Sequence, residues 1–382
     1  MKKYQKIYWK ILRPLVIVFL YFKFGYTFKV AKNLPDNFLV LSNHNTDFDP
    51  LLLGVSFKDS IRFVASEHIS RWKVAFKFVN HIFSPIMRPK GTKAASTVKD
   101  MLRTLRGGDN ICMFAEGARS WNGITAPILS STGKVVKSAR CALVTYKISG
   151  GYFCSPLWSE NGTRRGKIHG EVVNIYSAEQ IASMSVDEIN AIINSDLYED
   201  AYDRQAIEMN KYTGRHLAER MESMVYCCPN CKSIDSLSSS GETVSCKNCK
   251  NEFVYDKYGY ISGLEQKNVK ELFIFLRDKT LCDAKNNVAY SSPTSKIISV
   301  ENHVETLVSE GKLTLDNEKL ICGDKIISIS EIDDFAMHGR YALLLSTKDA
   351  YYEVLVDKNT SALKFHMLFQ AYRFGDINRF NF

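Results

Sequence analysis

Two pairs of cysteines constrain the folding of this chain more than any other feature of its sequence. Cys228 and Cys231 form one C-x2-C pair, Cys246 and Cys249 form a second, and 14 residues separate the pairs. Two thiolate pairs at this spacing close a tetrahedral four-sulfur site, and four protein ligands without an open position are typical of a structural metal. We predict a zinc ribbon over residues 227–260, with rubredoxin-type iron as the alternative metal.

The other cysteines do not indicate a disulfide framework. Five of the 10 cysteines lie within residues 227–249, and the rest are scattered singly. The basic start and the apolar run Leu15–Phe22 resemble a secretory signal, but Lys23 follows and no small-residue cleavage site is present. No apolar stretch reaches the roughly 20 residues that a bilayer-spanning helix needs, which excludes a polytopic membrane protein. We expect a reducing cytoplasm, where clustered cysteines bind metal more often than they form disulfides.

Cations and apolar side chains share the beginning of the chain at helical spacing. This pattern predicts a basic amphipathic helix that runs into Pro14 and the apolar run Leu15–Phe22 and lies in the headgroup layer of an anionic leaflet. A core helix with a solvated basic face is the alternative. Residues 1–175 hold 27 Lys and Arg against 10 Asp and Glu, a net charge of +17, whereas residues 176–382 have a net charge of −8. We therefore expect residues 1–34 to attach the protein to the cytoplasmic face of the cell membrane, as a peripheral or monotopic protein.

Short apolar runs alternate with helix-like stretches over residues 35–176, which predicts an α/β domain. Residues 177–226 are predicted to be helical, with a capping box at Ser185 and Glu188 and a charged helical pattern continuing over Met209–Met224. The predicted strands are Phe38–Leu41, Ile61–Ala65, Asn110–Phe114, Leu143–Ile148 and Phe153–Trp158, and the predicted helices are Pro50–Phe57, Trp72–Val79 and Ser96–Leu105.

A histidine and an aspartate follow the first of these strands. Pro50 is suited to a first helical turn, and Asp49 before it is suited to an N-cap. His44 lies five residues earlier, so its Nδ1–H could meet the Asp49 carboxylate. That contact would fix the tautomer and leave Nε2 available as a base. The alternative is a capping aspartate beside an ordinary loop histidine.

Two further loops carry charged groups at strand ends. Glu116 and Arg119 flank a tight turn at Gly117 directly after the strand that ends at Phe114. Sites in α/β proteins form at the carboxyl ends of strands, and an Arg fork suits phosphate. Arg88 lies on a second basic loop with Lys90 and Lys93. A surface Glu–Arg pair is the simpler interpretation of the first loop.

Taken in order, these loops resemble the lysophospholipid and glycerophosphate acyltransferase family over residues 35–175. That family shows Asn-His-x4-Asp, an Arg block, and Phe-Pro-Glu-Gly-Thr-Arg-Ser. Asn43, His44 and Asp49 complete the first block, and Ser120 ends the Glu-Gly-x-Arg-Ser core of the later block. Ala115 and Ala118 replace the usual proline and threonine, and Ser155-Pro156-Leu157-Trp158 is the candidate for a fourth, proline-containing block.

The resemblance implies a mechanism and a set of substrates. His44, oriented by Asp49, would deprotonate an acceptor hydroxyl that attacks the thioester of acyl-CoA or acyl-carrier-protein. The acceptor would be a lysophospholipid, with 1-acylglycerol 3-phosphate as the first choice. The alternative is an inactive, membrane-attached adaptor that works through the zinc ribbon and the C-terminal domain. The residues implied to bind the acceptor are Asn43, Arg88, Glu116, Gly117, Arg119 and Ser120.

The remaining residues predict a structural metal module and a binding module. The cysteine cluster could contact nucleic acid, but the acidic second half lacks a basic stripe, so we expect a small metal-stapled module instead. The serine run Ser236–Gly241 has the composition of a linker. From residue 313, short alternating runs and a final helix over Ser361–Tyr372 resemble the small β-barrels of the pleckstrin-homology-like group. We expect residues 264–382 to form such a domain and to bind a protein partner or a second copy of the chain.

Overall fold

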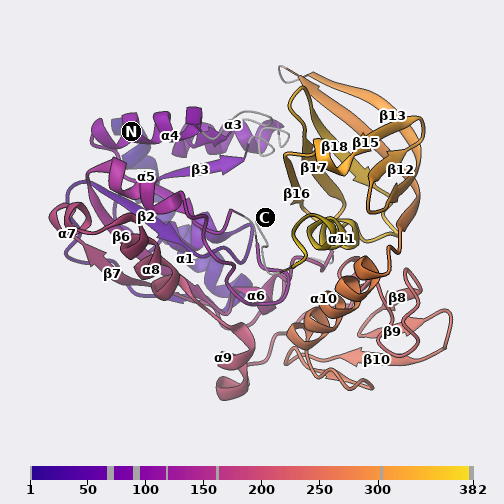
Figure 1. The fold of residues 1–382 in the computed structure, drawn as a ribbon. Coiled ribbons are helices and arrows are strands. Elements are labelled where there is room, and N and C mark those ends of the chain that lie inside the picture. Colours follow the sequence, from indigo (N-terminus) through magenta and orange to yellow (C-terminus); the bar gives the residue numbers. More distant parts are fainter. Residues whose placement is uncertain are drawn as a thin grey trace. The chain divides into compact units, whose positions relative to one another are not determined.

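The computed structural model describes residues 2–66, 73–88, 95–117, 119–160, 163–301 and 304–377 (Figure 1). The chain divides into two compact units, which we call the N-terminal unit and the C-terminal unit. The N-terminal unit comprises Met1–Ser120, Ile124–Ser155 and Thr163–Thr213, and the C-terminal unit comprises Trp121–Gly123, Pro156–Gly162 and Gly214–Phe382.

A mixed seven-stranded sheet forms the centre of the N-terminal unit, in the order β1-β7-β6-β2-β5-β3-β4. The five strands from β6 to β4 run parallel, β7 is antiparallel to β6, and β1 is parallel to β7. The predicted alternation of strands and helices is therefore present. The strands are β1 Thr27–Phe28, β2 Phe38–Ser42, β3 Arg62–Ser66, β4 Ile86–Arg88, β5 Ile111–Phe114, β6 Ala142–Ser149 and β7 His169–Tyr176.

Helices cover both faces of this sheet because successive strand residues point to opposite sides. Leu39 and Leu41 of β2 pack in a cluster with side chains of α4, α5, α7 and α8, whereas Phe38 stacks on Phe57 just beyond α2 on the other face. Figure 1 shows α5, α7 and α8 together on one face. The helices are α1 Lys3–Phe24, α2 Asp49–Gly54, α3 Lys73–Phe83, α4 Ala95–Arg106, α5 Thr132–Ala139, α6 Gly151–Cys154, α7 Ala178–Ser183, α8 Val186–Leu197 and α9 Ala201–Glu208.

The N-terminal helix is continuous through Pro14 and the apolar run to Phe24, because buried side chains before and after the proline, such as Trp9 and Leu20, fix it on the unit. Several sequence predictions for residues 1–226 were wrong in detail. The predicted strand Phe153–Trp158 is instead the fully buried helix α6 and a loop. Within Met209–Met224 only a short 3-10 helix, η2 Met221–Ser223, forms. Trp72, Lys90, Lys93 and Ala118 lie outside the described residues.

The cysteine module of the C-terminal unit contains a four-stranded antiparallel sheet in the order β11-β10-β9-β8. The serine run that we expected as a linker forms β8, because Leu237 is buried and pairs opposite Cys246 of β9. The strands are β8 Leu237–Ser240, β9 Thr243–Cys246, β10 Glu252–Tyr255 and β11 Ile261–Ser262.

The rest of the C-terminal unit is an antiparallel sheet in the order β15-β14-β13-β12-β18-β17-β16, with helices α10 Val269–Lys285 and α11 Ala362–Phe374. The predicted final helix is present, but the sheet begins at Tyr290 rather than near residue 313. The strands are β12 Tyr290–Glu301, β13 Val304–Leu315, β14 Lys319–Cys322, β15 Lys325–Ser328, β16 Asp334–His338, β17 Ala342–Ser346 and β18 Tyr351–Val356, with the 3-10 helix η3 Ile329–Glu331 after β15.

Candidate active site and candidate metal site

The predicted site loops leave the N-terminal unit at one edge of its sheet. Strands β2, β5 and β4 run in the same direction, so His44, Glu116 and Arg88 all lie at or just beyond their carboxyl ends. β2 and β5 are neighbours, whereas β3 separates β4 from β5. At about 4.8 Å per strand, β4 lies roughly 10 Å from β5. The sheet therefore brings His44 and Glu116 together and places Arg88 farther along the same edge.

The His44 imidazole contacts the Asp49 carboxylate as the sequence predicted, with Nδ1 2.8 Å from Oδ2. The imidazole stacks on Phe114, with ring centroids 4.5 Å apart, and its side chain is 21% exposed. Within the described residues, Nε2 has no hydrogen-bond partner. The ring is thus held at Nδ1 and open at Nε2, which is the arrangement that a general base requires.

Asp49 is the first residue of α2 rather than its N-cap, which is Phe48. Its carboxylate is fully buried and turns back into the loop, where Oδ2 accepts hydrogen bonds from the backbone N–H groups of Asn45 and Thr46 at 2.6 and 2.9 Å. Oδ1 accepts the Thr46 hydroxyl at 2.7 Å. With His44, four donors reach this one carboxylate, which fixes both the loop and the imidazole.

Glu116 connects the two motif loops. Oε1 accepts the His44 backbone N–H and Oε2 accepts the Ala126 backbone N–H, each at 2.7 Å. Burial, together with the nearby Asp49 and Glu199 carboxylates, raises the pKa of Glu116 to about 8, against the opposing effect of these two donors. Glu116 supports the histidine loop through its backbone, as a positioning residue.

The Arg119 guanidinium binds protein groups on three sides and is 11% exposed. Nε donates to the Asn45 carbonyl at 3.0 Å, and one terminal nitrogen donates to both the carbonyl and the hydroxyl of Ser155. The other terminal nitrogen meets the exposed Asp47 carboxylate at 3.1 Å. Four of its five N–H groups are therefore occupied. Through these bonds Arg119 joins the histidine loop to Ser155, the residue after α6.

The other predicted site residues differ in their solvent exposure and in their structural roles. The Asn43 side chain is buried and bonds the backbone of Ile148 through both its oxygen and its nitrogen, each at 2.8 Å. Gly117 has a φ of 75°, a left-handed conformation that favours glycine. Ser120 is buried, and Arg88 is exposed at the end of β4. Asn43 and Gly117 thus have clear structural roles.

Sequence reasoning missed Thr46 and Asn45, which complete this site, and it named Ser155 only as part of a candidate fourth block. Thr46 orients Asp49, Asn45 binds Arg119 through its carbonyl, and Ser155 binds Arg119 from the far side. A hydroxyl residue midway between His44 and Asp49 was a usable signal, because threonine readily forms local hydrogen bonds in turns. The contribution of a backbone carbonyl has no such signal in the side-chain pattern.

The four predicted cysteine ligands come together in the C-terminal unit, where their sulfur atoms all lie within 4.8 Å of one another. The sulfurs of Cys228 and Cys249 are 3.8 Å apart, and those of Cys231 and Cys246 are 3.7 Å apart. A tetrahedral zinc at about 2.3 Å from each sulfur requires separations of roughly 3.8 Å. The cluster could therefore hold a metal of this size, with Cys228 rather than Cys227 as the ligand.

The two cysteine pairs form matching turns. Lys232 and Lys250 each follow a pair with a φ of 61°, and each donates its backbone N–H to the carbonyl of the first cysteine of that pair. The Asn230 side chain donates to the sulfur of Cys249 at 3.5 Å, and Asn248 does the same for Cys231 at 3.6 Å. Each turn thus supplies an amide donor to a sulfur of the other, which suits thiolates that share a cation.

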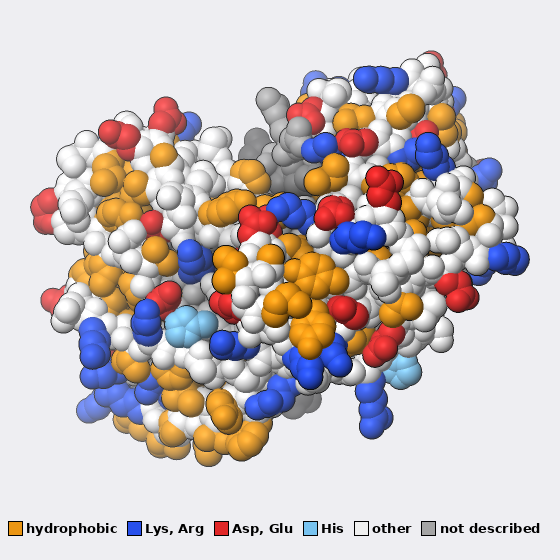
Figure 2. Space-filling view, turned by 90° about the horizontal axis from the view of Figure 1, so that it is seen from below, with side chains coloured by type: hydrophobic (Ala, Val, Ile, Leu, Met, Phe, Trp, Pro, Cys, Tyr) orange, Lys and Arg blue, Asp and Glu red, His pale blue; other side chains and the backbone are white. Residues whose placement is uncertain are grey.

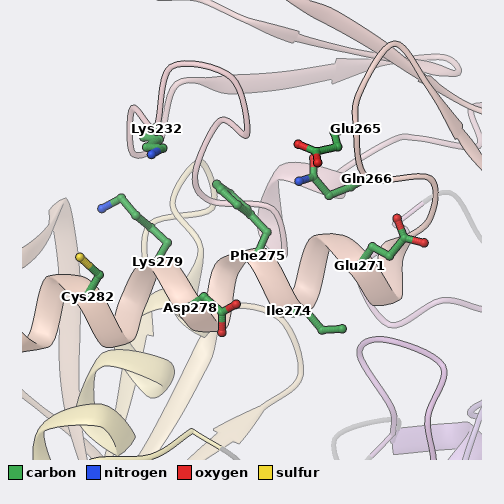
Figure 3. A pocket seen from close by; sticks show the side chains of 9 residues that line it. All are labelled: Lys232, Glu265, Gln266, Glu271, Ile274, Phe275, Asp278, Lys279 and Cys282. Carbon is green, nitrogen blue, oxygen red and sulfur yellow. The ribbon is translucent and has the colours of Figure 1, made fainter.

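A hollow of about 530 Å³ lies beside α10, also in the C-terminal unit (Figure 3). Figure 3 shows Lys232 and Lys279 near one end, Glu265 and Glu271 near the other, and Asp278 between them. The Glu271 carboxylate already accepts hydrogen bonds from the Lys267 backbone and the Asn268 side chain. The hollow mixes both charges with the apolar groups of Ile274 and Phe275 and is separate from His44, which belongs to the other unit.

Comparison with known proteins bears on the family of the N-terminal unit. Residues 26–149 match the family model described as Acyltransferase. This confirms the predicted family resemblance, and residues 26–149 form an acyltransferase-family domain. Among solved structures, the chain is similar to the 1-acyl-sn-glycerophosphate acyltransferase PlsC from Thermotoga maritima, with a TM-score of 0.45 and 16% identity over 53% of this chain and 81% of that chain. No curated protein matches the sequence.

Proposed function

We propose that this protein transfers a fatty acyl group from acyl-CoA or acyl-carrier-protein to the hydroxyl of a lysophospholipid, with 1-acylglycerol 3-phosphate as the first choice of acceptor. The observation that carries the proposal is the contact between the His44 imidazole and the buried Asp49 carboxylate, inside a domain that matches the acyltransferase family. A histidine base needs one ring nitrogen fixed by a hydrogen bond and the other accessible to the substrate proton. In His44 these are Nδ1 and Nε2.

His44 Nε2 takes the proton from the acceptor hydroxyl as the oxygen attacks the thioester carbonyl. Asp49 stabilises the imidazolium that forms. The tetrahedral intermediate then expels the thiolate, which takes the proton back from His44, so a new ester and a free thiol result. Glu116 and Arg119 keep the histidine loop in place during both steps.

The acceptor phosphate requires a cationic group that is accessible. Arg88 is exposed on the same edge of the sheet as His44. Arg119 becomes available only if the phosphate replaces Asp47, whose side chain is 69% exposed and therefore easily displaced. We propose that the acceptor phosphate binds Arg88 and the terminal nitrogen of Arg119 that contacts Asp47. The reactive hydroxyl would bind at the loop that bears His44.

Helix α1 is the proposed membrane contact. No helix in the described part of the chain is long and apolar enough to cross a bilayer. Residues 7, 11, 15, 18 and 22 form an exposed apolar row, and residues 3, 6, 10 and 13 form a cationic row beside it. Apolar and basic side chains gather together at the lower left of Figure 2. This combination suits a helix lying on the cytoplasmic face of an anionic membrane.

The C-terminal unit takes a structural and binding role in this proposal. The cysteine cluster would hold zinc to staple the small sheet formed by β8 to β11. The larger antiparallel sheet would bind a protein partner or a second copy of the chain. The domain limits that we propose remain residues 1–34, 35–176, 177–226, 227–260 and 264–382.

Acyl transfer by the purified full chain on vesicles tests the proposal. Labelled acyl-CoA or acyl-carrier-protein is offered with lysophosphatidate, and product is compared between the wild type and His44→Ala. We expect transfer by the wild type and none by the variant, at equal thermal stability and metal content. If neither protein transfers to any acceptor but both bind vesicles equally, the adaptor function replaces the enzyme.

A further inference from the structure

We propose that Lys10, Arg13 and Lys58 form a subsite for the phosphate of an anionic membrane lipid, distinct from the acceptor site at His44. These three cations line a hollow of about 370 Å³ in the N-terminal unit, together with Asp59. Lys10 and Arg13 come from α1, and Lys58 comes from the segment after α2. The proposal rests on the proposed membrane contact of α1 but does not depend on acyl transfer.

One of the three cations is fixed in position. Arg13 Nε donates to the carbonyl of Val55 at 2.9 Å, and its guanidinium lies 5.9 Å from the centre of the Phe28 ring. Since only Nε bonds to another described residue, both terminal nitrogens retain their donors. A guanidinium held by Nε presents these remaining donors as a fork, which suits two oxygens of one phosphate.

The charge around the hollow is not neutralised by the protein. Over the described ranges of the chain, no ion pair joins Lys10, Arg13 or Lys58 to a carboxylate, although Asp59 also lines the hollow. Three cations against one acid leave a net charge of +2. Like charges held together in this way repel one another, and an anion of charge −1 or −2 relieves that repulsion.

The position of the hollow favours a lipid as the source of the phosphate. Lys10 lies next to Ile7 and Ile11 on α1, which are 49% and 61% exposed and belong to the apolar row. A helix on a membrane places such an apolar row among the acyl chains and the flanking cations at the depth of the headgroups. A lipid with its phosphate in the hollow would place its chains beside this row.

The test compares the double variant Lys10→Gln/Lys58→Gln with the control Lys3→Gln/Lys6→Gln. The control also removes two positive charges, but both come from positions on α1 outside the hollow. All proteins also carry His44→Ala, so that no turnover interferes. Each is titrated with monomeric dihexanoylphosphatidic acid, with inorganic phosphate, and with phosphatidylcholine vesicles that contain phosphatidic acid. Arg13 is left unchanged because it bonds the backbone of Val55.

We expect saturable binding of the short-chain lipid, weakened about 25-fold in Lys10→Gln/Lys58→Gln, from about fivefold per lysine. The Lys3→Gln/Lys6→Gln protein should keep this binding and lose only part of its vesicle affinity. The proposal is overturned if both double variants bind the short-chain lipid equally, or if the parent protein with His44→Ala alone does not bind it. Binding of inorganic phosphate alone, with vesicle affinity independent of Lys10 and Lys58, would make this a free-phosphate site and also overturn it.

Discussion

Replacement of Asp49 by asparagine tests how the histidine is activated. The carboxylate is fully buried, and its Oδ2 accepts from the His44 ring and from two backbone N–H groups. An asparagine with its oxygen in the Oδ2 position keeps these three contacts and directs its amide nitrogen at the Thr46 hydroxyl. The substitution Asp49→Asn therefore removes the negative charge while nearly preserving the shape of the loop.

The cost of this change can be worked out from the contacts. A hydrogen bond to a charged group contributes about 1.5–3 kcal/mol and one to a neutral group about 0.5–1.5 kcal/mol. Neutralising the acceptor of three bonds should thus lower the free energy of unfolding by about 3–4 kcal/mol, which a domain of ordinary stability survives. The loss in catalysis should be larger, because an Asp→Asn change behind a catalytic histidine lowers kcat by about 10⁴ in serine proteases.

The assay follows acyl transfer on vesicles together with thermal melts of the same samples. Thr46→Val is the matched control, because it removes the hydroxyl that donates to Asp49 Oδ1 and accepts from the Phe48 backbone N–H, and it leaves the charge of Asp49 in place. We expect Asp49→Asn to lose about 10³–10⁴ in kcat and Thr46→Val less than about tenfold. If Asp49→Asn retained more than a tenth of wild-type kcat while His44→Ala were inactive, Asp49 would only brace the loop.

Four further results are expected. Glu116→Gln should lower the free energy of unfolding by about 1–3 kcal/mol in chemical denaturation, since its amide nitrogen must face a backbone N–H. The pKa of Glu116 is raised to about 8 by burial, so the stability that its protonated form contributes is fully present below pH ~4.5 and is lost as the pH rises through 8. Between these pH values, the melting temperature of Glu116→Gln should therefore fall less than that of the wild type. Metal analysis should find about one zinc per chain, absent in Cys228→Ser/Cys246→Ser, with a lower melting temperature after chelation. Gly170→Ala would place a Cβ 2.2 Å from the Tyr146 hydroxyl and should destabilise by about 1–3 kcal/mol, and an unchanged melting temperature would contradict this packing.

The strands and motif loops of the N-terminal unit were predictable because burial on both faces makes a strand uniformly apolar. Residues Phe38 to Leu41 are all buried, and the polar motif begins directly after them. The two cysteine pairs were predictable for a different reason, since their spacing alone defines matching turns. In both cases the signal is local in sequence.

The missed features depend on contacts that are distant in sequence. β12 and the first half of β13 are rich in serine, threonine and exposed side chains, so no alternation marks them, and their pairing with each other and with β18 fixes them. Arginine commonly binds phosphate, yet in Arg119 the contacts with Asn45 and Ser155 occupy most of the N–H donors. Neither contact can be inferred from the residues that surround Arg119 in the chain.

The chain passes between its two units after residues 120, 123, 155, 162 and 213. A module gained by gene fusion at one end of an enzyme is normally joined through a single linker. Here Trp158, which lies in sequence between β6 and β7, packs edge-on against Tyr255 of β10 with ring centroids 5.3 Å apart. Ending the chain at residue 213 would uncover this indole. We therefore expect residues 1–213 and 214–382 to be inherited together. A protein that ends at residue 213 should be prone to aggregation.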